Sequence, residues 1–245
     1  MKNFAVVFAV ILCCSFCAVS QEIEQDLSHF TRVVASPRIH VILSKGEQES
    51  VRLVYSGVSA DKINIKVSAK TLRLYLDGAR KFERRTPSGT DDTRRKSMYS
   101  GAVVTAYVTY RELDLLEIRG EQELTCNDPI DSEQFTLRAY GENEVTLSSL
   151  RTDFFKAKLY GENRLSIRKG KATEQQYSLY GENRIDTRAL RSKYTSANTF
   201  GENSLKVSCR EEMRIHAFGE PEIRVDGGAQ ISSRVVIGNA SIERY

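Results

Sequence analysis

A short motif that recurs about every twenty residues through the C-terminal half most constrains the fold of this chain. The glycines that mark it are spaced by 21, 20, 20, 20, 18 and 19 residues. In the four central copies an aromatic residue precedes the glycine and Glu-Asn follows it. A fixed period of this length is typical of stacked repeat architectures. The marking glycines are Gly120, Gly141, Gly161, Gly181, Gly201, Gly219 and Gly238.

Around each glycine, apolar and polar residues alternate, which predicts half-buried strands with even positions facing a core. Four residues after the glycines stand Leu124, Val145, Leu165, Ile185, Leu205, Ile223 and Ile242. Six residues after them stand Cys126, Leu147, Ile167, Thr187, Val207 and Val225. Two residues before them stand Ile118, Ala139, Leu159, Leu179, Thr199, Ala217 and Val236.

A unit of about 20 residues holds two or three short strands, so the pattern predicts an all-β, right-handed parallel β-helix. A leucine-rich repeat shares the period but needs another Leu and Asn spacing and usually a helix. A left-handed hexapeptide solenoid needs a six-residue subperiod, which the sequence lacks.

The repeat solenoid is expected over residues 119–245, continuous with residues 21–118, which supply the first turns and an irregular cap. Strand patterns occupy residues 39–43, 51–55, 63–67, 72–76, 103–110 and 113–118. Residues 78–101 are polar and lack periodicity, with seven basic and three acidic residues between Arg80 and Lys96. We interpret this segment as a solvated loop; the alternative is a basic arm for an anionic surface or glycan.

Residues 1–20 predict a signal peptide: Lys2 precedes an apolar run, and Ala18-Val19-Ser20 forms a cleavage site. The apolar run is too short for a membrane anchor, and a lipoprotein signal lacks its usual motif. We therefore expect export to the periplasm, the cell surface or the medium, and no transmembrane span in the mature chain. The net charge of +4 across 245 residues gives no reason to expect nucleic acid as a partner.

Two cysteines, Cys126 and Cys209, remain after the leader. Export would permit a disulfide, but the repeat places them four turns apart, about 19 Å at the strand spacing. That distance exceeds disulfide reach, so the sequence predicts two buried free thiols.

The motif residues predict a structural ladder. Glycine permits a sharp bend and close stacking, and inward asparagines can bond from turn to turn. The expected ladder consists of Gly141, Gly161, Gly181, Gly201, Asn143, Asn163, Asn183 and Asn203.

The residues flanking these glycines form the candidate binding surface. The glutamates should form an outward column with steps of about 4.8 Å. The aromatic residues have two possible directions. They line up outside if the alternation continues through the glycine, where they could contact sugars or a protein partner. The arrangement we favour tucks them into a corner of the core, because five exposed rings would lower solubility. The set comprises Tyr140, Tyr160, Tyr180, Phe200, Phe218, Glu142, Glu162, Glu182 and Glu202.

Residues 37–43 with Lys45-Gly46, residues 72–74 and 113–118, and the repeated Gly-x-Asn units resemble a bacterial family described as putative auto-transporter adhesin, head GIN domain. The resemblance covers about residues 30–240. It implies a right-handed β-helix, an export signal and an origin in Bacteroidetes, and it offers no catalytic residues to carry over. This chain departs from the pattern by its glutamate inside each Gly-x-Asn unit and by the basic segment 78–101.

No set of residues in the sequence predicts catalysis. The histidines, His29, His40 and His216, are scattered and show no metal-ligand spacing. A hydrolase or lyase site mixes residue types at one place, whereas this glutamate column repeats itself. We therefore expect an exported, non-enzymatic, adhesin-like binding or scaffold protein without cofactor or metal, whose partner is a glycan or a cell-surface protein. The alternative is a polysaccharide-active enzyme on the same scaffold.

Overall fold

The structure is a computed structural model that describes residues 21–79 and 103–244. The expected signal peptide and nearly all of the basic segment 78–101 lie outside the described residues. Within them the chain forms strands and one short 3-10 helix, η1 (Ala60–Lys62). In the N-terminal half the strands are β1 (Gln21–Asp26), β2 (Arg32–Ala35), β3 (Ile39–Lys45), β4 (Ser50–Ser56), β5 (Ile63–Ser68), β6 (Thr71–Leu76) and β7 (Val103–Tyr110). In the repeat region they are β8 (Leu115–Asp131), β9 (Gln134–Ile167), β10 (Gly170–Gly181), β11 (Arg184–Gly201), β12 (Ser204–Gly219), β13 (Glu222–Asp226), β14 (Gln230–Ile237) and β15 (Ser241–Arg244).

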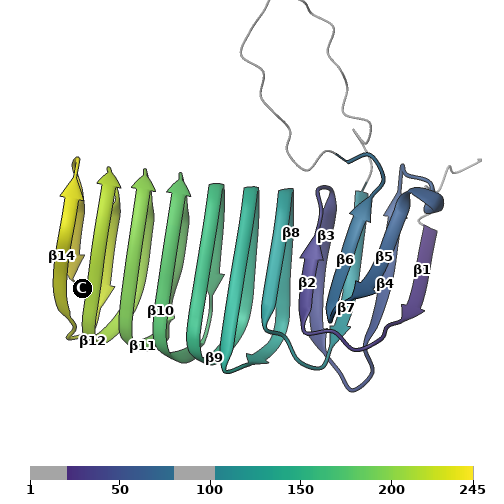
Figure 1. Ribbon diagram of the computed structural model, residues 1–245, viewed down its shortest axis with the longest axis horizontal. Coiled ribbons are helices and arrows are strands. Elements are labelled where there is room, and N and C mark those ends of the chain that lie inside the picture. Colours follow the sequence, from purple (N-terminus) through teal and green to yellow (C-terminus); the bar gives the residue numbers. More distant parts are fainter. Residues whose placement is uncertain (1–20, 80–102, 245) are drawn as a thin grey trace, which may run out of the picture.

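The repeat region is a parallel β-solenoid of about six turns spaced about 20 residues apart, which confirms the predicted fold class. Each turn, called a rung below, pairs in parallel with the next along the row of strands from β8 to β14 in Figure 1. The register joins equivalent repeat positions, such as Gly120 with Gly141 and Gly181 with Gly201. Every motif residue therefore stacks on its counterpart one rung away.

The core runs without interruption from Phe30 to Ala229 through the centre of the stack. The three predicted apolar columns are buried in all rungs before the last. In the last rung Val236 is 42% exposed and Ile242 is only half-buried. The assignment of Val236 to the core was wrong, because a side chain in a solenoid is buried by the rungs on both sides and the last described rung has one neighbour. Ile242 still packs against the core.

The N-terminal half supplies the first rung and the strands beyond it. β3 pairs in parallel with β7 and β8, and β2 pairs in parallel with β6 and β8. The pairing then becomes antiparallel: β4 joins β7, β1 joins β4, and β5 joins β6. Figure 1 shows these strands at the end of the row opposite β14. The first rung of the parallel stack is thus covered by other strands.

Cys126 and Cys209 are free and buried, as predicted. The Cys126 thiol lies 3.4 Å from the Tyr110 hydroxyl oxygen, and burial raises the pKa of that thiol to about 11. Such a thiol is protonated at neutral pH and behaves as a small apolar group. Across residues 21–79 and 103–244, no helix has the length and apolarity that crossing a membrane requires.

Candidate binding face

The glycine bends determine which way the neighbouring side chains point. The motif glycines have φ between +100° and +113°, a region that only glycine adopts without strain. A Cβ on Gly141, Gly161, Gly181, Gly201 or Gly219 would lie 2.3–2.7 Å from the carbonyl oxygen of the glycine one rung earlier. Glycine is therefore required both for the backbone conformation and for the stacking distance.

The aromatic residues before these glycines point outward and form one continuous column. Ring centroids of successive rungs are 4.8–5.2 Å apart and the ring planes differ by 1–5°. The rings are half-buried, and the most exposed, Tyr180, reaches 36%. The favoured expectation that they tuck into the core was wrong. Stacking covers the ring faces and leaves the edges in water, which removes most of the expected solubility cost. The column consists of Tyr140, Tyr160, Tyr180, Phe200 and Phe218.

Partial burial and the neighbouring Tyr180 and Tyr140 raise the pKa of the Tyr160 hydroxyl above its ordinary value. The Tyr160 hydroxyl group is therefore neutral at physiological pH. Each of the three tyrosine hydroxyl groups in the column can donate one hydrogen bond and accept others.

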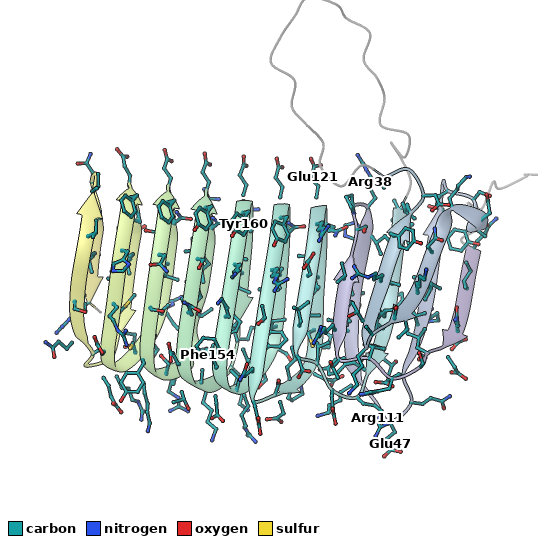
Figure 2. The ribbon with its side chains drawn as sticks, in the orientation of Figure 1. Arg38, Glu47, Arg111, Glu121, Phe154 and Tyr160 are labelled. Carbon is teal, nitrogen blue, oxygen red and sulfur yellow. The ribbon has the colours of Figure 1, made fainter. Side chains whose placement is uncertain are left out.

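The glutamates after the glycines are exposed and form a second column beside the rings. Figure 2 shows Glu121 and Tyr160 on the same edge of the solenoid, from which a row of oxygen-tipped side chains projects. Glu121 and Glu220 extend the column by one rung at each end. The complete column is Glu121, Glu142, Glu162, Glu182, Glu202 and Glu220.

A shallow groove of about 680 Å³ follows this glutamate column along the stack. Its floor contains Asn143, Asn163 and Asn203, and its second wall is formed by the residues three positions after the glycines. That wall changes along the axis and has both signs of charge: Glu123, Glu144, Arg164, Arg184, Ser204 and Glu222. The groove therefore combines a constant acidic side with a variable side.

The asparagines are buried and form a ladder of amides. Nδ2 of Asn143, Asn163 and Asn183 each donates to Oδ1 of the next asparagine at 2.9 Å. The backbone N–H groups of Asn163 and Asn183 donate to the same acceptors at 3.3 Å. Gln122 takes the place of an asparagine in the first rung, where its Oε1 accepts from the Ile39 N–H at 2.9 Å. The amides thus hold the bends together and give the groove a rigid floor.

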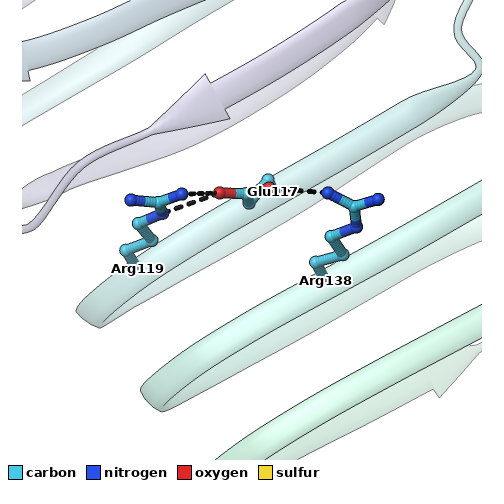
Figure 3. Close-up of polar contacts among 3 residues, drawn as sticks. All are labelled: Glu117, Arg119 and Arg138. Atoms are coloured by element: carbon cyan, nitrogen blue, oxygen red, sulfur yellow. Dashed lines mark hydrogen bonds and ion pairs between the residues drawn. The ribbon is translucent and has the colours of Figure 1, made fainter. Parts of the chain in front are cut away.

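An ion-pair cluster begins the aromatic column, and the sequence reasoning missed it (Figure 3). Arg119 stands one rung before Tyr140, and its guanidinium carbon lies 5.7 Å from the ring centre. Glu117 is buried and accepts from Arg119 Nε at 2.7 Å and from Arg138 Nη1 at 3.4 Å. The available signal was the occurrence of arginine, rather than an aromatic residue, before Gly120.

The histidines lie apart from one another and from any catalytic arrangement. His29 contacts Glu49, His40 contacts the Glu123 N–H, and His216 contacts Asn198. In the described part of the chain, no group of three or more His, Cys, Asp or Glu side chains could hold a metal ion. The aromatic and glutamate columns instead present a rigid, repeated surface of ring edges, hydroxyl groups and carboxylates. Such a surface suits binding.

Comparison with known proteins agrees with this architecture. Residues 29–229 match the model of the family described as "Putative auto-transporter adhesin, head GIN domain". No curated protein matches the sequence.

Solved structures share the fold at low sequence identity. An adhesin structure from Bacteroides fragilis is 14% identical with a TM-score of 0.72, covering 93% of this chain and 97% of the other. One from Parabacteroides merdae is 13% identical with a TM-score of 0.67, covering 92% of this chain and 96% of the other. One from Parabacteroides distasonis is 14% identical with a TM-score of 0.66, covering 94% and 98%. All three are described as a "putative adhesin". Since the family model spans most of its length, this chain belongs to the family described as "Putative auto-transporter adhesin, head GIN domain".

Proposed function

We propose that the protein is an exported, non-enzymatic, adhesin-like module that binds an extended neutral glycan along the aromatic–glutamate face. This face is defined as the five-ring aromatic column, the glutamate column and the groove beside them. The observation that carries the proposal is the unbroken column of rings at 4.8–5.2 Å, beside a column of carboxylates that also recurs once per rung.

The chemistry of the face fits sugar hydroxyl groups. Ionised carboxylates accept hydrogen bonds from neutral donors, and such charge-assisted bonds are about twice as strong as neutral ones. The hydroxyl groups of Tyr140, Tyr160 and Tyr180 add donors and acceptors along the same line. Because the rings cover one another's faces, sugars would contact ring edges and hydroxyl groups and would not stack on ring faces. A polymer with regularly repeated hydroxyl groups suits a surface that repeats every rung.

The charge of the face argues against an acidic glycan at this place. Six carboxylates recur along one side of the groove, while Arg164 and Arg184 are the basic residues of its other wall apart from His40. An anionic polymer lying there would meet like charges at every rung. A neutral polymer can use the same carboxylates as acceptors.

The test measures binding of a panel of neutral polysaccharides, for example galactomannan, xyloglucan and arabinan, by affinity electrophoresis and calorimetry. We expect at least one to bind, and expect Glu162→Gln with Glu182→Gln to weaken it about tenfold or more by removing two charged acceptors. The control is Glu24→Gln with Asp26→Asn, which removes the same charge from exposed positions on β1. Binding that is equal in both double variants, or absent for the whole panel, would refute the proposal. If a purified protein binds at this face and no glycan does, the ligand of the face is a protein and the glycan proposal is wrong.

The enzymatic alternative receives no support from an arrangement of the described residues. The glutamate column repeats one residue type at one position in each rung, whereas a glycosidase site combines two carboxylates that have different roles. Incubation of bound polysaccharide with the protein should release no reducing ends.

A further inference from the structure

A second groove lies on another part of the solenoid, at residues about ten positions after the motif glycines. It has a volume of about 700 Å³ and is lined by residues of β8 to β12. Figure 2 shows Phe154, next in sequence to the groove residue Asp153, at the edge of the stack opposite Glu121 and Tyr160. The second groove is therefore separate from the aromatic–glutamate face.

The charge of this groove changes along the axis. Near β8 and β9 it contains Asp131, Glu133 and Asp153 against Arg151, which pairs with Asp131 at 3.6 Å. Over the next three rungs the charged lining is entirely basic: Lys171, Arg191, Lys193 and Arg210. We call these four residues the basic cluster.

The fold holds the backbones of Lys171 and Arg191 in register and places Lys193 and Arg210 at an irregular step between rungs. Lys171 and Arg191 are register partners on adjacent rungs, which repeat at about 4.8 Å. Lys193 lies where the register shifts between β11 and β12, opposite Arg210 and Glu211. Glu211, which follows Arg210 in sequence, lies beside the hydroxyl group of Tyr194 and raises the pKa of that group.

The basic cluster lacks internal neutralisation. Among residues 21–79 and 103–244, none of its four side chains takes part in an ion pair, whereas Arg151, Arg188, Arg214 and Arg224 each contact a carboxylate. The hydroxyl groups on the groove floor are occupied, since Thr152 bonds to the Glu133 carbonyl and Ser192 to the Ser208 carbonyl. Recognition in this groove therefore falls to the four cationic side chains.

From this arrangement we propose that the basic cluster binds a linear anionic polysaccharide, one that carries carboxylate or sulfate groups along its chain. The cluster has at least one cation on each of its three rungs. These cations can pair with anionic groups that recur at successive sugars of the polysaccharide. The acidic residues around Asp153 repel a polyanion and limit the site to the three basic rungs. Lys and Arg both suit these anions, and arginine adds two-pronged hydrogen bonds.

Nucleic acid fits the basic cluster less well. Double-stranded DNA carries one charge per about 1.7 Å, so four cations over three rungs would neutralise a small part of the charge that it presents. The acidic half of the groove would then face the remaining phosphates. An anionic saccharide of lower charge density avoids this repulsion.

The test uses calorimetry with four probes: an oligogalacturonate, a heparin oligosaccharide, neutral dextran and oligo(dT). We expect the oligogalacturonate, the heparin oligosaccharide or both to bind, and the pattern distinguishes carboxylate from sulfate recognition. Lys171→Ala with Arg191→Ala should weaken binding about tenfold or more and make it less dependent on salt. The matched control is Lys66→Ala with Arg73→Ala, because these cross-strand neighbours are exposed on β5 and β6 and carry the same charge. The control should change affinity less than about twofold.

Three results would overturn the inference: neither charged saccharide binds, both double variants lose affinity equally, or oligo(dT) binds more tightly than the saccharides. Equal melting temperatures for the two variants show that folding is not the cause of lost binding. The inference does not depend on the proposed function. Glu162→Gln with Glu182→Gln should leave the charged saccharide bound, so failure at one groove is distinguishable from failure at the other.

Discussion

The guanidinium group of Arg119 lies over the ring of Tyr140, with 5.7 Å between the guanidinium carbon and the ring centre. It occupies, one rung earlier, the place that an aromatic residue takes in the rungs that follow. Buried Glu117 holds it there through the bond from Arg119 Nε at 2.7 Å. The aromatic column therefore ends on a cation that is itself fixed by a buried carboxylate.

Replacing Arg119 by Ala should destabilise the fold by about 2–3 kcal/mol. The change uncovers the Tyr140 ring and leaves the Glu117 carboxylate with Arg138 at 3.4 Å as its remaining ion-pair partner. Urea unfolding followed by circular dichroism measures the free energy of unfolding.

Arg151→Ala serves as the control for that measurement. Its ion pair with Asp131 is mostly exposed at 3.6 Å, so the loss should stay below about 0.5 kcal/mol. In addition, Glu117→Gln combined with Arg119→Ala should cost less than the sum of the single changes, because no buried charge is left behind. Equal losses for Arg119→Ala and Arg151→Ala would contradict the role given to Glu117.

The fold was predictable because the rungs repeat the same physical requirements. The alternation around each glycine predicted the buried columns, and the recurrence of Gly-Glu-Asn predicted in-register stacking. The direction of the aromatic residues was harder to predict, because it depends on the φ angle of Gly141, Gly161 and their equivalents, which composition does not specify. Val236 was assigned to the core wrongly because a pattern shared with inner rungs carries no information on what covers the last one. Arg119 could not be predicted from the motif, because the central repeats have an aromatic residue at that position.

Gly181→Ala should lower the free energy of unfolding by about 3 kcal/mol or more. Alanine is strained at φ +103°, and its Cβ would lie 2.5 Å from the Gly161 carbonyl oxygen. Because each bend stacks on the next, the displacement would also disturb the neighbouring rungs. Thermal and urea unfolding of the purified variant measure the loss.

The matched control is Gly228→Ala. No φ in the left-handed region is required there, and the nearest atom to a new Cβ is the Arg210 carbonyl oxygen at 4.0 Å. This substitution should be neutral or slightly stabilising, since alanine restricts the unfolded chain more than glycine does. Similar losses at both positions would show that the bend tolerates a side chain.

Asn183→Ala should destabilise the protein more than Asn143→Ala, by about 1–2 kcal/mol. The Asn183 side chain accepts from the side chain and backbone N–H of Asn163, and donates to Asn203. Asn143 Nδ2 donates to Asn163, but its Oδ1 has no partner among the described residues. Removing Asn183 therefore leaves more buried groups unsatisfied. Equal unfolding free energies for the two variants would mean that the amide bonds do not determine the stability of the ladder.

The last prediction concerns the pH dependence of stability that arises from Cys126. Burial raises the pKa of its thiol to about 11, from 9.0 when exposed. Below pH 9 the thiol is protonated in both states, and its contribution to stability is fully present. Between pH 9 and 11 the unfolded chain loses the proton first, so stability falls as pH rises, by about 2 kcal/mol across the window.

The Cys126→Ala substitution removes this contribution and so provides the test. The difference in unfolding free energy between wild type and Cys126→Ala, measured at pH 8 and pH 10.5, should shift against the wild type as pH rises. Comparison of the two proteins cancels ionisable groups that do not contact Cys126. Tyr110 is an exception, because burial and its contact with the Cys126 thiol both raise the pKa of its hydroxyl group. If the difference in unfolding free energy between wild type and Cys126→Ala does not change over this pH range, the thiol has the same pKa in the folded and unfolded states, and the prediction is wrong.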